Sequence, residues 1–128
     1  MSARALLTCW PFPGHVFPQM SIAHALRERG CDVAIYTAEE SRNLVESEGF
    51  RFFPFRALKP ESYERIHQME QTVGGRRQSA RVGHQAFRNW LVETIPEQVS
   101  DIQVILDEWQ PDVIVTDMNM WGPILILW

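Results

Sequence analysis

Ala5-Leu6-Leu7-Thr8-Cys9 leads directly into Trp10-Pro11-Phe12-Pro13-Gly14-His15-Val16-Phe17-Pro18, and the rest of the chain is best understood from this junction. The first stretch is almost continuously apolar and is followed by turn residues, which is typical of a parallel strand buried on both faces. The second stretch is a loop that brings His15 to the start of a helix. Because open α/β sheets bind their ligands beyond the carboxyl ends of the strands, we expect this loop to lie at the edge of the sheet where a ligand would bind.

Strands and helices alternate along the chain after this loop. Pro18 is expected in the first turn of a helix, where proline is best tolerated, and Gly30 provides the left-handed residue that ends it. Pro54 places the end of the third strand near a sheet edge or a bulge, and Pro96 divides a long helical segment. The predicted strands are residues 5–9, 32–37, 50–55 and 111–117; the predicted helices follow Pro18, occupy 39–48 and 80–109 and restart at Gly122, and residues 60–78 are expected to form short helices and loops.

This alternation predicts an α/β fold, with a Rossmann-like, doubly wound, mostly parallel sheet and right-handed crossovers. A length of 128 residues suits one domain with a real hydrophobic core. The chain ends at Trp128 inside an apolar run, which is expected to pack on something further along the protein. We therefore interpret residues 1–128 as a single domain that is truncated before a second one.

Composition excludes several classes of protein. The net charge of −4 argues against a nucleic-acid-binding surface. The basic cluster Arg76-Arg77 with Arg81 is expected on a solvated helix face or loop, with an anion site as the alternative. Two cysteines, Cys9 and Cys31, make no disulfide framework and are expected to be reduced thiols in a cytoplasmic protein. No signal peptide is visible, and the apolar run over residues 118–128 is too short to form a transmembrane segment.

The loop after the first strand also excludes two common chemistries. A phosphate-binding turn needs several glycines so that the backbone can approach the ligand, whereas this loop has Trp10, Phe12 and the single glycine Gly14. No Walker lysine follows, and no histidine, cysteine or carboxylate cluster suggests a metal. We therefore expect no metal and no bound cofactor. A Rossmann-like hydrolase or oxidoreductase is disfavoured, since the nucleophile elbow is missing as well.

His15 and Asp117 are the candidate catalytic residues. A histidine beside the positive end of a helix stays neutral more easily and can act as a general base, although it can equally be a helix-entry residue without chemistry. Asp117 ends the last predicted strand at the same sheet edge. Its carboxylate can orient the imidazole and stabilise the charge formed on proton uptake. The alternative for Asp117 is a cap for the helix that follows.

At these positions the chain resembles a known family. Pro13-Gly14-His15-Val16-Phe17-Pro18, followed by Ile22-Ala23-His24-Ala25-Leu26-Arg27-Glu28-Arg29-Gly30-Cys31-Asp32-Val33, is similar to the start of the UDP-glycosyltransferase superfamily. These are two-domain GT-B enzymes of glycosyltransferase family 1 that glycosylate small molecules. Pro111-Asp112-Val113-Ile114-Val115-Thr116-Asp117 resembles a later strand of the family. The chain has Cys31 where histidine is common and Gln19 where an apolar residue is common.

The resemblance implies a role for each candidate residue. His15 matches the catalytic base, which takes the proton from an acceptor hydroxyl, and Asp117 matches the acid that orients it. The implied reaction is inverting, metal-independent transfer of a hexose from a nucleotide-diphosphate sugar, a co-substrate, to a small apolar acceptor. The implied acceptor-binding residues are Trp10, Phe12, Gly14, Met118, Met120 and Trp121, with Phe87 and Trp90 as weaker candidates. Core packing is the alternative for the large apolar side chains among them.

The C-terminal domain that binds the nucleotide sugar in this family lies outside the sequence. Without it nothing neutralises the leaving diphosphate, so we expect the isolated 128-residue chain to be inactive. That domain is expected in cis, in a longer protein, or in trans, on a partner chain. In the second case the chain is a non-catalytic binding subunit of a split glycosyltransferase. The identities of the acceptor and the sugar do not follow from the sequence.

Overall fold

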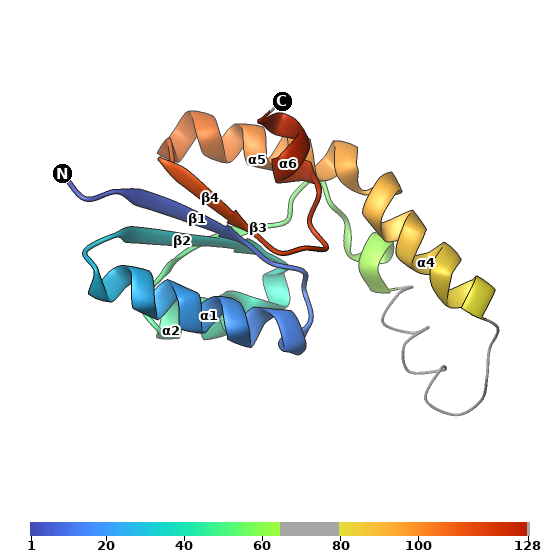
Figure 1. Ribbon diagram of the computed structural model, residues 1–128, viewed down its shortest axis with the longest axis horizontal. Helices are drawn as coiled ribbons and strands as arrows, with labels where there is room; N and C mark the ends of the chain where they lie inside the picture. The colour runs from blue at the N-terminus through green and yellow to red at the C-terminus, as the bar shows by residue number, and fades with distance from the viewer. Residues whose placement is uncertain (65–79, 128) are drawn as a thin grey trace.

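The computed structural model describes residues 1–64 and 80–127, and the side chains of 80–83 and 86 are not described. Strands and helices alternate as the sequence predicts (Figure 1). The elements are β1 (Arg4–Thr8), α1 (Pro13–Glu28), β2 (Asp32–Thr37), the 3-10 turn η1 (Glu39–Ser41), α2 (Arg42–Ser47), β3 (Arg51–Pro54), α4 (Ala80–Glu93), α5 (Ile95–Trp109), β4 (Val113–Thr116) and α6 (Gly122–Ile126). The chain is also helical over residues 60–64.

The described strands form one parallel sheet in the order β3-β2-β1-β4. Central β1 pairs with β2 through Ala5 and Val33, and with β4 through Ala5 and Val113. The strand that contains Pro54 lies at the edge of the sheet. This position suits proline, which has no backbone N–H to donate, because an edge strand is paired on one side only. Since the strands are all parallel, the loops after β1 and β4 leave the sheet at the same edge.

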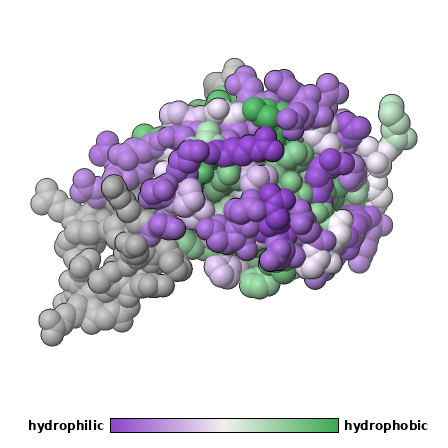
Figure 2. Space-filling view, turned by 180° about the vertical axis from the view of Figure 1, so that it is seen from behind, coloured by the Kyte–Doolittle hydropathy of each residue, from purple (hydrophilic) through white to green (hydrophobic). Residues whose placement is uncertain are grey.

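Helices cover both faces of the sheet, which confirms the doubly wound α/β prediction. In Figure 1, α1 and α2 lie on one side, and α5 and α6 lie on the other. Successive side chains of β1 point to opposite faces of the sheet and pack in two separate core clusters. Leu6 belongs to the cluster with Trp90 and Ile102, and Leu7 belongs to the cluster with Val16 and Val45. The face shown in Figure 2 is covered mainly by hydrophilic residues, with small apolar areas between them.

Several helix ends confirm the turn chemistry that the sequence predicts. Gly30 and Gly49 follow α1 and α2 with φ angles of +85° and +80°, the left-handed conformation that glycine adopts without a steric penalty. Pro96 lies in the first turn of α5, where its missing N–H removes no helical hydrogen bond, so the helical segment breaks at Thr94.

The start of α1 corrects the prediction. The helix begins at Pro13, so Pro18 lies inside it rather than in its first turn. Pro13 supplies the fixed φ that suits a first helical position. Pro18 removes the hydrogen bond to the carbonyl of Gly14, but both residues are exposed, so water can satisfy that carbonyl. As a consequence His15 lies within the first turn of α1 and not before it.

Some predictions fall outside the described residues. Most of the segment 60–78, including Arg76 and Arg77, belongs to this group, as does the side chain of Arg81. Over the residues that the structure does describe, no helix is both long and apolar enough to cross a lipid bilayer. The same residues contain no cluster of three or more His, Cys, Asp or Glu side chains suited to holding a metal ion.

Candidate active site

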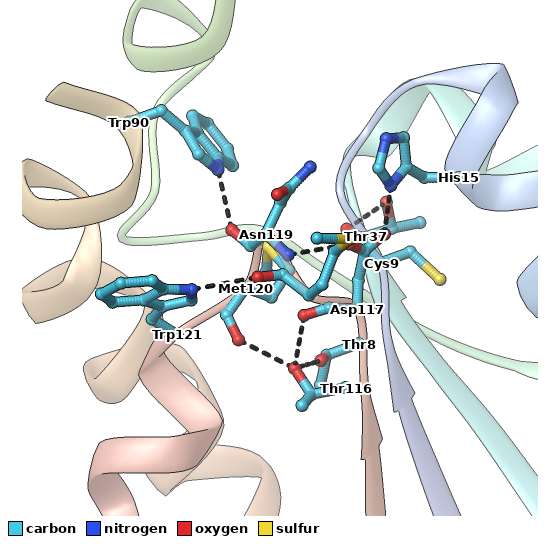
Figure 3. A network of polar contacts seen from close by, with 11 residues as sticks. Thr8, Cys9, His15, Thr37, Trp90, Thr116, Asp117, Asn119, Met120 and Trp121 are labelled. Carbon is cyan, nitrogen blue, oxygen red and sulfur yellow. Dashed lines mark hydrogen bonds and ion pairs between the residues drawn. The ribbon is translucent and has the colours of Figure 1, made fainter. Parts of the chain in front are cut away.

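His15 and Asp117 meet at the carboxyl edge of the sheet. His15 is carried by the first turn of α1, directly after β1, and Asp117 follows the last residue of β4. Thr8 and Thr116 pair in register at the ends of these neighbouring strands, which brings the two following segments together. Nδ1 of His15 lies 2.6 Å from Oδ2 of Asp117 (Figure 3). The contact that the sequence suggested is therefore present.

Both carboxylate oxygens of Asp117 are engaged. Oδ2 faces His15, and Oδ1 accepts a hydrogen bond of 2.9 Å from the backbone N–H of Asn119. The backbone N–H of Asp117 itself donates to the carbonyl of Thr8 at 2.9 Å. The Asp117 side chain is 4% exposed, so it is held in one orientation, away from bulk water.

A network of threonine hydroxyls and backbone groups holds the turn after β4. Thr8 Oγ1 donates to Thr116 Oγ1 at 2.9 Å, and Thr116 Oγ1 in turn donates to the carbonyl of Met120 at 2.8 Å. The N–H of Met120 donates to the carbonyl of Asp117 at 2.9 Å. Asp117 therefore closes its own turn and does not cap the next helix, since α6 begins at Gly122 with no side-chain cap.

The contact assigns the tautomer of His15. A buried carboxylate accepts a hydrogen bond, so in the neutral imidazole Nδ1 carries the proton and the lone pair is on Nε2. The His15 side chain is 34% exposed, so an external hydroxyl can reach the ring. When Nε2 takes a proton, the negative charge of Asp117 stabilises the resulting imidazolium. This pair has the geometry of a general base with its orienting carboxylate.

Cys9 lies close to this pair but is not suited to nucleophilic chemistry. It is fully buried at the end of β1. Burial raises the pKa of the Cys9 thiol, and the nearby Asp117 carboxylate raises it further. Because the thiolate is the reactive form, this cysteine stays an unreactive core residue, as expected for a reduced thiol.

Aromatic rings gather beside His15, with Trp10 at their centre. The Trp10 ring stacks on the rings of Trp90, His15 and Phe87 at centroid distances of 5.1, 5.5 and 5.7 Å. Phe12 lies tilted against it at 5.6 Å. Trp10 and Trp90 are buried, whereas Phe87 is 42% exposed. The wall beside the base is therefore aromatic and is rigidly packed on its inner side.

The structure separates the predicted acceptor-binding residues into two groups. Trp10 and Met120 are buried in the core, so core packing describes their side chains. Met118 and Trp121 are exposed, Phe12 is half-buried, and a Cβ at Gly14 would meet no atom within 4 Å beyond its chain neighbours and the backbone of its own helix. The residues of the second group are accessible from solvent, so they stay candidates for contact with an acceptor.

Sequence reasoning missed the polar supports of the site. Thr8 and Thr116 end otherwise apolar strands, and this placement is a signal that could have been noticed. Trp90 donates from its indole N–H to the carbonyl of Asn119 at 3.0 Å. No sequence signal indicates this contact, because it joins residues on different elements through a backbone oxygen.

Comparisons with known proteins show that this fold, with its His–Asp pair at the carboxyl edge, resembles the N-terminal domain of GT1-like glycosyltransferases of GT-B architecture. No family model matches the chain. It is 31% identical over 123 residues to 4'-demethylrebeccamycin synthase of Lentzea aerocolonigenes, covering 95% of this chain and 29% of that protein. The chain thus spans less than a third of the length of this curated relative.

Solved structures support the same fold. The glycosyltransferase SsfS6 of Streptomyces sp. SF2575 matches with a TM-score of 0.74 and 18% identity, over 97% of this chain and 36% of that one. The glycosyltransferase SnogD of Streptomyces nogalater matches with a TM-score of 0.66 and 20% identity, over 95% of this chain and 31% of that one. At these identities the two matches establish the fold and leave substrates open.

Proposed function

We propose that this chain supplies the acceptor-binding domain and the general base of an inverting, metal-independent glycosyltransferase. The observation that carries the proposal is the 2.6 Å contact between His15 Nδ1 and Asp117 Oδ2 at the carboxyl edge of the sheet. The similarity to a curated synthase and the GT-B fold support the class of reaction. Under this proposal residues 1–128 form one acceptor-binding domain.

The proposed reaction uses Nε2 of His15. The acceptor hydroxyl gives its proton to Nε2 while its oxygen forms a bond to the anomeric carbon of the sugar. The bond from that carbon to the nucleotide diphosphate breaks, and the diphosphate leaves with the electron pair. Attack from the face opposite the leaving group inverts the configuration. Asp117 stabilises the imidazolium until the proton is released to solvent.

The surroundings of His15 suit a small apolar acceptor. Phe12 packs on Trp10, which stacks on His15. Met118 and Trp121 are exposed apolar residues of the turn that follows Asp117, and Gly14 precedes the base without a side chain. Ligand sites commonly combine such apolar walls with a few fixed polar groups. Here the fixed polar group is the His15–Asp117 pair, which would select a hydroxyl at the reacting position.

Catalysis by this pair also requires a nucleotide-sugar domain, supplied in cis or in trans. Stabilising charge on the departing group is commonly among the largest contributions to such reactions. The chain by itself is therefore proposed to transfer sugar at a negligible rate, and measurable turnover by the purified chain would contradict this.

The test starts from the gene. Reading it beyond codon 128 establishes whether a second α/β domain follows or a partner chain must be found. In the completed protein, His15→Ala is expected to abolish turnover. His24→Ala is the matched control, because His24 lies on the same helix and pairs with a carboxylate, Glu48, at 3.0 Å. Equal activity of the two variants would remove His15 from the mechanism.

A further inference from the structure

The candidate base and its carboxylate belong to a closed ring of contacts. His15 Nδ1 contacts Asp117 Oδ2 at 2.6 Å, and Asp117 Oδ1 accepts from the backbone of Asn119 at 2.9 Å. The carbonyl of Asn119 accepts from the Trp90 indole N–H at 3.0 Å (Figure 3). The Trp90 ring stacks on Trp10 with an interplanar angle of 23°, and Trp10 stacks on His15 with an angle of 28°. Each member therefore touches the next.

Trp90 is the member of this ring that reaches the pair from both sides. Its ring supports Trp10, which forms the wall against the His15 imidazole. Its N–H supports the turn that holds the Asp117 carboxylate. It comes from α4, whereas His15 and Asp117 come from the segments after β1 and β4. It is 1% exposed, so both contacts are made away from water.

We propose that Trp90 is a positioning residue that sets the geometry of the His15–Asp117 pair through its indole N–H and its ring. The expected effect of Trp90 on turnover rests on the proposed function, whereas its effect on the geometry of the pair does not. An indole is suited to both contacts, because it offers a flat apolar face and a single donor at its edge. Phenylalanine at this position would keep part of the ring stacking on Trp10. It would leave the Asn119 carbonyl without the indole donor, and Asn119 is only 8% exposed.

The first readout is independent of activity. In the 128-residue chain, the Nδ1 proton of His15 is observed by NMR, and its exchange with water reports how firmly the pair is held. For Trp90→Phe we expect exchange to become about fivefold faster, the effect of one neutral hydrogen bond lost from the supporting turn. Trp109→Phe is the matched control: it removes another buried indole from the same core, at the opposite edge of the sheet, where the Trp109 carbonyl accepts from Arg4.

The second readout is kinetic and uses the completed enzyme. Trp90→Phe is expected to lower kcat about fivefold with an unchanged KM for the nucleotide sugar, whereas Trp109→Phe leaves kcat unchanged. Where Trp90→Phe does not fold, benzothienylalanine at position 90 serves instead, because its sulfur keeps the bicyclic ring and removes only the N–H. Protein made by the same method with tryptophan at position 90 must show the wild-type exchange rate.

The outcomes separate the two proposals. Faster Nδ1 exchange in the Trp90 variant alone supports the positioning role. Equal exchange in the Trp90 and Trp109 variants overturns it, whatever the enzyme does. If exchange responds as expected but His15→Ala leaves turnover intact, the positioning role stands and the proposed catalytic function fails.

Discussion

Nδ1 of His15 lies 2.6 Å from Oδ2 of Asp117, although 102 positions of sequence separate the two residues. The carboxylate is 4% exposed and the imidazole is 34% exposed, so the ring lies between a buried negative charge and the solvent. A proton taken from an external hydroxyl would thus be stabilised from behind without rearrangement of either side chain.

The charge of Asp117 can be separated from its structural role. Asp117→Asn keeps an oxygen that can accept from Asn119 but removes the negative charge, so turnover of the completed enzyme is expected to fall by about 10²–10⁴-fold. Asp117→Ala also leaves the Asn119 N–H without its acceptor and is expected to lower the free energy of unfolding by about 1–3 kcal/mol. Steady-state kinetics and urea unfolding measure the two effects. Unchanged turnover in the asparagine variant would argue against a charge-based role.

Asp101 is expected to be the more important aspartate for stability. Its buried carboxylate accepts from Tyr36 Oη at 2.7 Å and from the backbone N–H groups of Arg56 and Ala57 at 2.9 and 2.7 Å. Asp101→Ala leaves these donors without an acceptor and should lower the free energy of unfolding by about 3 kcal/mol. Asp107→Ala, an exposed site on the same helix, should change it by less than about 0.5 kcal/mol. Equal urea midpoints for the two variants would contradict this.

Alkaline pH should destabilise the fold through two buried groups. Burial raises the pKa of Cys9 above its ordinary 9.0, with Asp117 adding to the effect. Burial, then the charge and hydrogen bond of Asp101, raise the pKa of Tyr36 above its ordinary 10.0. Both groups keep their protons in the folded protein at pH values where the unfolded chain loses them. Their contribution is therefore complete below the unfolded pKa and is lost as pH rises.

The measurement is the free energy of unfolding as a function of pH. Above pH 10.0 it should fall by up to about 1.4 kcal/mol per pH unit for each group. Tyr36→Phe removes one titrating group and should make this slope shallower, even though it also lowers the stability at neutral pH by removing the bond to Asp101. A slope equal to that of the wild-type protein would show that Tyr36 does not contribute.

Two glycines should respond in opposite ways to the same substitution. A Cβ at Gly122 would lie 2.4 Å from Cβ of Gln98, whose side chain also accepts from the Gly122 N–H at 2.9 Å. Gly122→Ala must therefore push α6 away from α5 and is expected to destabilise by about 1–3 kcal/mol. Gly14→Ala meets no atom within 4 Å, lies in α1, and should stabilise by up to about 1 kcal/mol. Thermal unfolding distinguishes the two, and a destabilised Gly14 variant would contradict the second expectation.

Local rules explain why much of the fold could be predicted. Buried parallel strands require apolar runs, so the strand at 32–37 is predicted with its observed bounds. Helix ends at Gly30 and Gly49 follow from a φ that other residues avoid. The start of α1 could not be predicted as well, because Pro13 and Pro18 both suit a first turn, and the solvent exposure of Gly14, which lets water reach its unpaired carbonyl, is a property of the folded protein.

By itself, the sequence determined the alternation of strands and helices and the edge of the sheet to which His15 and Asp117 belong. These features depend on residue type and on neighbours within a few positions. The tertiary structure added the distance between the pair, the burial of Trp10 and Met120, and the contact from Trp90 to the Asn119 carbonyl. Those properties arise when elements far apart in the chain pack together, so no local pattern encodes them.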